Sequence, residues 1–211
     1  MTILNLGQLY EEITEHLLSD EVPSSYINKL SHMPEYAINP FQMLWKMKTT
    51  EQSKAHHPEG SVWNHTLMVI DEAAKLRIQS KNPKVLMWAA LLHDIGKPST
   101  TRNKNGKITS YDHDSVGEKL CIQFLEYFTT DQEFIRNVAH MVRYHMHMLF
   151  ILKNMPFADK KGLSIHVDPY EIALLCKSDR LGRDGSSKKE VEEEYNRFLQ
   201  LLLNTTNASK Y

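Results

Sequence analysis

The stretch KVLMWAALLHDIGKP, residues 84–98, decides how this chain folds. Its apolar run from Val85 to Leu92 is uninterrupted, and it follows Asn82–Pro83, which ends the preceding helical segment. A helix that is apolar on every side must be buried, so this segment is predicted to form the central helix of the core. Gly96 and Pro98 end it.

Helical periodicity extends outward from this segment in both directions and predicts an all-α bundle of about eight or nine helices. Helices are expected around Leu9–Leu17, after Ser24–Ser25, from Pro40, from Ser61 to before Asn82, from Ser115 to Tyr127, from Asp131 to about Leu152, from Asp168 to Arg180, and from Ser187 to about Leu203. Lys160–Gly162 is expected in a loop.

One segment does not follow the helical pattern. TTRNKNGKITSYD, residues 100–112, places Asn105–Gly106 between short arms of mixed polarity. An Asn-Gly pair in this setting is the strongest short hairpin signal. We therefore expect one short β-hairpin-like loop at about residues 99–112, positioned as a flap beside a site between the central helices.

Composition limits the classes of function. The 211 residues fit one domain with a helical extension, and the net charge of −1 gives no general attraction to nucleic acid or to an acidic membrane surface. Two cysteines do not suggest a disulfide framework. The N-terminus lacks the pattern of a signal peptide, and no segment approaches the roughly 18 apolar residues of a membrane helix. A cytoplasmic protein with no membrane contact is expected, and this composition does not exclude a small phosphorylated substrate.

Histidine is the residue type that stands out, with 11 in the chain. Six imidazole and carboxylate groups lie on different predicted elements, apart from one adjacent pair: His65, His93, Asp94, His113, His145 and Asp179. A helix bundle can direct such groups inward to a metal, and imidazole with carboxylate but without thiolate favours Mn, Fe, Co, Ni or Zn. From the residues alone, ordinary capping and surface histidines remain the alternative.

The order His65, His93–Asp94, Asp179 resembles the HD superfamily of metal-dependent phosphohydrolases. The stretches HPEGSVWNHTLMV, AALLHDIGKPSTT, GKITSYDHDSVGEKL, RYHMHMLF and CKSDRLGRDG are similar to the HD domain of bacterial tRNA nucleotidyltransferases, the CCA-adding enzymes, over roughly residues 30–185. The chain resembles a stand-alone HD domain, so CCA addition is not expected of it. We expect an N-terminal helical extension packed on the core at 1–50, an HD domain at 51–204 and a frayed tail at 205–211.

The resemblance also implies a reaction. A metal-bound water would attack and hydrolyse a phosphomonoester or a cyclic phosphodiester, and the ester would belong to a nucleotide. His65, His93, Asp94 and Asp179 match the ligands of a first divalent ion, with magnesium as an alternative metal. His113 and His145 match ligands of a second ion, although His147 could replace His145. Asp94 would bridge two ions, and Lys97 matches the phosphate-binding lysine.

Other residues keep two interpretations. His57 and Glu59 either orient His65 or form a structural turn. Arg102, Arg143 and Arg183 either bind substrate phosphate or form surface salt bridges. Two other functions remain open: a non-catalytic module that binds a nucleotide or an RNA end, and an HD-type di-iron oxygenase. Little in the sequence favours nucleic acid as a partner, and it does not define an oligomeric state.

Overall fold

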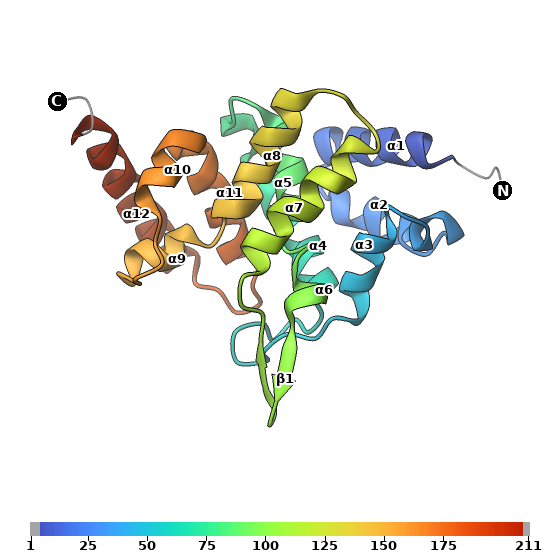
Figure 1. The fold of residues 1–211 in the computed structure, drawn as a ribbon, viewed down its shortest axis with the longest axis horizontal. Coiled ribbons are helices and arrows are strands. Elements are labelled where there is room, and N and C mark those ends of the chain that lie inside the picture. The colour runs from blue at the N-terminus through green and yellow to red at the C-terminus, as the bar shows by residue number, and fades with distance from the viewer. Residues whose placement is uncertain (1–4, 209–211) are drawn as a thin grey trace.

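The computed structural model describes residues 5–208, with side chains through residue 204. Over these residues the chain is a helical bundle with one two-stranded hairpin, which confirms the predicted all-α fold (Figure 1). The helices are α1 (Leu6–Ser19), α2 (Pro23–Leu30), α3 (Gln42–Trp45), α4 (Val62–Leu76), α5 (Pro83–Leu92), α6 (Lys97–Thr100), α7 (His113–Glu126), α8 (Gln132–Tyr144), α9 (His147–Leu152), α10 (Lys160–His166), α11 (Pro169–Leu181) and α12 (Lys188–Ala208). Short 3-10 helices are η1 (Pro34–Ala37), η2 (Lys46–Thr49) and η3 (Arg77–Gln79).

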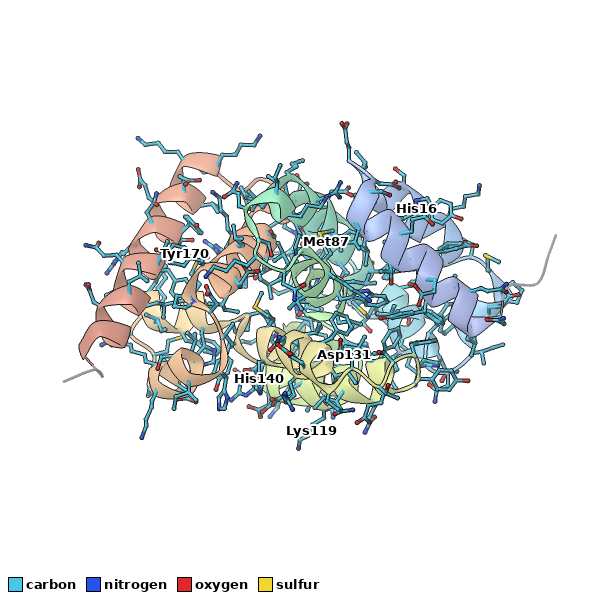
Figure 2. All side chains as sticks on the ribbon, turned by 90° about the horizontal axis from the view of Figure 1, so that it is seen from above. His16, Met87, Lys119, Asp131, His140 and Tyr170 are labelled. Atoms are coloured by element: carbon cyan, nitrogen blue, oxygen red, sulfur yellow. The ribbon has the colours of Figure 1, made fainter. Side chains whose placement is uncertain are left out.

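Helix α5 forms the centre of the bundle, as its apolar sequence predicts. Its residues from Val85 to Leu92 are at most 4% exposed, because α1, α4, α8 and α11 pack around it. Figure 2 shows Met87 near the middle of the molecule. Trp88 donates its indole N–H to the Thr14 hydroxyl at 3.2 Å, so its polar atom is also satisfied. The C-terminal end of α5 is therefore held from several sides.

Helices α1 and α2 pack on α4 and α5 (Figure 1). Tyr10 of α1 stacks on both Trp88 and Phe128, with centroid distances of 4.7 Å to each ring. One continuous cluster of buried apolar side chains includes members from α1 through α12. The core has no break at residue 50, and the division of the chain at that position stays a prediction.

The predicted hairpin is confirmed. Strands β1 (Arg102–Lys104) and β2 (Lys107–Thr109) pair antiparallel and project from the bundle at the bottom of Figure 1. Asn105 and Gly106 have φ angles of 53° and 79°. A two-residue hairpin turn requires such positive angles, and asparagine and glycine adopt them most readily.

The predicted helix at 131–152 is interrupted, because α8 ends before His145 and α9 begins after Met146. At the break, His145 Nδ1 lies 2.6 Å from the Val142 carbonyl oxygen. This hydrogen bond satisfies a carbonyl that a helix end leaves free. The periodic apolar pattern continues across the break and therefore could not reveal it.

A loop expected at Lys160–Gly162 is the start of α10 instead. Asp159 caps this helix by accepting a hydrogen bond from the Gly162 N–H at 2.8 Å. Glycine disfavours helix interiors, which explains the wrong prediction. Glycine is needed at position 162 because a Cβ atom there would overlap the Asp159 side chain and the Tyr144 hydroxyl.

Two helix boundaries also differ from the prediction. Helix α7 begins at His113 rather than Ser115, after Asp112 with a left-handed φ of 59°. Helix α12 continues to Ala208, so the predicted frayed tail is partly helical, and residues 209–211 lie outside the described part of the chain. Within residues 5–208, no helix is both long and apolar enough to cross a membrane.

Candidate metal centre

The six predicted donor side chains meet around the end of α5. His65 comes from α4, His93 and Asp94 from the end of α5, His113 from the start of α7, His145 from the end of α8, and Asp179 from α11. All six are at most 8% exposed. Packing of α4 and α11 on α5 and on each other brings together residues that are up to 114 positions apart.

The donor atoms form two adjoining groups, each with its atoms within 4.8 Å of one another: His65, His93 and Asp179, and Asp94, His113 and His145. In the first group His65 Nε2 lies 3.0 Å from Asp179 Oδ1. Asp94 directs one oxygen to each group. Its Oδ2 is 3.2 Å from His93 Nε2, and its Oδ1 is 3.5 Å from His113 Nε2 and 3.7 Å from His145 Nε2.

Three of the imidazoles are held in the same tautomer. Each directs Nδ1 to the carbonyl oxygen three residues earlier, at 2.8 Å for His93, 2.7 Å for His113 and 2.6 Å for His145. Because a carbonyl can only accept, Nδ1 carries the hydrogen and Nε2 keeps a lone pair. The same hydrogen bond fixes histidine ligands in metal sites.

These lone pairs face other acceptors. The Nε2 atoms of His113 and His145 are 3.2 Å apart, and neither carries a hydrogen in this tautomer. Among the described residues, His93 Nε2 and Asp94 Oδ1 are buried without a hydrogen-bond partner. Buried acceptors that converge in this way are unfavourable unless a cation lies between them. The donor set therefore fits a divalent metal ion.

Burial and charge set the ionisation of these groups. Burial, together with the neighbouring His113, lowers the pKa of His145 to about 3, and burial also lowers the pKa of His113. Burial would raise the pKa of Asp94, but the neighbouring Lys97 outweighs it and holds that pKa well below its ordinary value. At neutral pH these two imidazoles are neutral and the carboxylate is ionised, which are the forms that bind metals.

Glu59, in the turn before α4, lies behind His65. Its Oε1 is 2.9 Å from His65 Nδ1 and 2.8 Å from His57 Nδ1. Burial would raise the pKa of Glu59, but the hydrogen bond from His65 and further ones lower it to about 2. Of the two interpretations of this turn, the contacts support the one in which Glu59 orients His65, with His57 attached to the same carboxylate.

Lys97 is mostly buried beside Asp94 and lines the site cavity. Its Nζ lies 2.7 Å from Asp94 Oδ2 and donates a hydrogen bond to Gln52 Oε1 at 2.6 Å. Sequence reasoning missed Gln52, which lies 45 positions earlier. No motif marks this glutamine, and only the packing of its loop against α6 brings it to the site.

The three predicted arginines have different surroundings. Arg183 pairs with Asp179 at 2.9 Å, Arg143 pairs with Asp114, and both arginines line the cavity. Arg102 instead donates to the carbonyl oxygens of Ser99 and Thr101, lies on an exposed strand, and is not among the residues that line the cavity. The expected substrate contact of Arg102 is therefore not supported by its position.

The structure distinguishes His145 from His147. His145 faces Asp94, whereas the ring of His147 lies against Tyr144 and Phe150, with centroid distances of 4.8 and 5.3 Å. His147 is fully buried, and neither of its nitrogens has a hydrogen-bond partner in the described structure. The start of α9 places it in the wall behind the site.

A cavity of about 800 Å³ opens onto Asp94, Lys97 and the second donor group. The end of the hairpin, the turn around His57 and the connection between α9 and α10 form its walls. This size is typical of small-molecule sites. An adjoining hollow of about 910 Å³ lies between the hairpin and residues 48–55, and none of the six donors lines it.

The number of bound ions can be tested through the second donor group. We expect about two metal equivalents in the wild-type protein and about one in a His113→Ala/His145→Ala double variant, because two-metal sites share a bridging carboxylate such as Asp94. Elemental analysis after dialysis against Mn²⁺ measures this. His147→Ala serves as the buried-histidine control and should keep both equivalents. One equivalent in wild type and double variant alike would contradict a second ion.

A family model described as "HD domain" matches residues 62–184, which is more than half of the chain and includes all six donors. A "Multifunctional CCA protein" of Actinobacillus pleuropneumoniae serotype 5b (strain L20) is 29% identical over 187 residues, which cover 85% of this chain and 44% of that protein.

Two further proteins with the same description are similarly related. The one from Pseudomonas fluorescens (strain SBW25) is 29% identical over 65% of this chain and 34% of its own length. The one from Methylococcus capsulatus (strain ATCC 33009 / NCIMB 11132 / Bath) is 32% identical over 65% and 33%, respectively. The chain therefore spans less than half the length of these relatives.

Proposed function

Because this chain belongs to the HD domain family, a family of metal-dependent phosphohydrolases in general, we propose that it hydrolyses a phosphomonoester or a cyclic phosphodiester of a nucleotide. The observation that carries the proposal is the convergence of four imidazoles and two carboxylates in two buried groups beside one cavity, with Lys97 next to Asp94. A pure binding module has no need of this buried arrangement.

The residues of the chain would hold a divalent ion in either group or in both, with Asp94 shared. When bound, the ion supplies activation of water and neutralises charge on the phosphoryl group. Lys97 places a cation beside Asp94, at the boundary between the donors and the cavity, where it can bind a phosphoryl oxygen. Arg183 and Arg143 also line the cavity wall, each paired with a carboxylate.

The relatives are described as multifunctional CCA proteins, and that description covers chains more than twice the matched length. The HD domain family model matches residues 62–184 of this chain, which include all six donor residues. We therefore propose only hydrolysis at this site, and no step of CCA addition.

Activity is the direct test. Purified protein with Mn²⁺, Co²⁺, Ni²⁺ or Mg²⁺ should release phosphate from an aryl phosphate or a nucleotide, and should open a 2′,3′-cyclic nucleotide. Treatment with a chelator should abolish the reaction, and added metal should restore it, because the donors by themselves offer no nucleophile. Phosphate release and product chromatography measure the two reactions.

Two outcomes would contradict the proposal. A metal-loaded protein that is inert on mono-, di- and cyclic esters but binds nucleotides would be a binding module. Tightly bound iron together with an oxygen-dependent product would indicate the di-iron oxygenase.

A further inference from the structure

One wall of the site cavity is apolar and has no part in the metal centre. It is formed by α9 and the connections on either side of it, through Met146, Leu149, Phe150, Met155 and Phe157. The wall begins at Met146, directly after the donor His145, so a group attached to a phosphate at the metal centre would lie beside it.

Phe157 is unusually open for a phenylalanine at a cavity, with 60% of its surface exposed. Its ring forms a T-shaped pair with Phe150, with centroids 4.7 Å apart and an interplanar angle of 90°. Such a pair leaves at least one face of each ring uncovered by the other. A single exposed apolar residue is ordinary, but one that continues an apolar cavity wall indicates a binding surface.

The charges around the cavity are largely neutralised. Four of its basic side chains pair with carboxylates: Lys97 with Asp94, Arg143 with Asp114, Arg180 with Glu194, and Arg183 with Asp179. Lys153 lines the cavity without a carboxylate partner among the described side chains. Beyond the phosphate, recognition therefore depends on apolar contact more than on charge, which favours a flat, uncharged ring over a second phosphate.

Resting on the proposed function, we infer that this wall is the subsite for the nucleobase, and that Phe157 selects nucleoside monophosphates by packing on the base. Aromatic side chains stack on every nucleobase. The sulfur atoms of Met146 and Met155 make favourable contacts with aromatic ring edges. The cavity volume of about 800 Å³ is sufficient for one such ligand.

The test compares AMP with ribose 5-phosphate, which has the same phosphomonoester and no base. Phe157→Ala should raise KM for AMP about tenfold and leave kcat unchanged, because one lost stacking contact changes binding by about this factor. Both constants for ribose 5-phosphate should stay unchanged, and Phe157→Trp should retain the wild-type KM for AMP. Tyr127→Ala is the matched control, since Tyr127 is also 60% exposed but lies outside the cavity.

Calorimetric titration of the Mn²⁺-loaded protein with AMP separates this inference from the proposed function. A tenfold weaker Kd in Phe157→Ala supports the subsite even if no ester is hydrolysed. Hydrolysis of both substrates with the same KM in wild type would overturn the subsite and leave the hydrolase intact. An equal loss on both substrates in Phe157→Ala would also overturn it, because a local packing defect has no preference for the base.

Discussion

Asp94→Ala is expected to lower the metal-dependent rate of phosphate release by at least about a thousandfold, since even changes behind a ligand lower metal affinity or activity about 10 to 100-fold. Asp94 contacts donors of both groups through its two oxygens, so its loss removes charge from each. Steady-state rates and metal content should fall together. A folded variant with unaltered turnover would contradict this mechanism.

Asp94 is also the ion-pair partner of Lys97, so the folding of the Asp94→Ala variant must be checked. Asp94→Asn keeps the volume of the side chain and should lose activity to a similar extent while remaining folded by circular dichroism. Asp71→Asn is the matched control, because Asp71 accepts hydrogen bonds from Ser24 in a structural contact outside the cavity. It should change thermal stability without changing the rate.

Lys97→Ala should behave differently from either aspartate variant. Lys97 offers positive charge to a phosphoryl oxygen but no lone pair to a metal at neutral pH. We therefore expect a higher KM and a lower rate with unchanged metal content, measured on the same samples by elemental analysis. Loss of metal in Lys97→Ala would place the lysine in the support of the metal ligands instead.

Gly96→Ala is expected to destabilise the fold by about 3 kcal/mol or more, at the upper end of overpacking effects. A Cβ atom at Gly96 would lie 2.7 Å from the Gly117 backbone nitrogen and even closer to the His113 carbonyl oxygen. Neither backbone atom can move without displacing α7 and its donor His113. Thermal unfolding should show a decrease in Tm of roughly 10 °C, together with loss of metal.

Gly117→Ala provides the comparison at the same contact between α6 and α7. The nearest neighbour of a Cβ atom at Gly117 would be a methyl carbon of Val142 at 3.1 Å, and the Val142 side chain can adjust. We expect a cost of about 1 kcal/mol or less, as for mild overpacking. Equal stability of the two variants would show that the backbone approach at Gly96 is not as tight as described.

The sequence by itself determined the elements whose cause is local. The uniform apolar character of residues 85–92 requires a buried segment, and Asn105–Gly106 allows the positive φ angles of a tight turn. The six donors were identified from residue type and from resemblance to the HD superfamily. The structure brings these six side chains together, whereas their roles as metal ligands and in catalysis stay predictions.

Only the tertiary structure decided which side chains meet at the site. The break after α8 separates His145 from His147, although both lie in one periodic pattern. Gln52 and Phe157 reach the cavity through loops whose positions depend on packing, and the hairpin keeps Arg102 outside it. Local periodicity fixes a helix through hydrogen bonds four residues apart, but contacts between distant residues depend on how complete helices pack against one another.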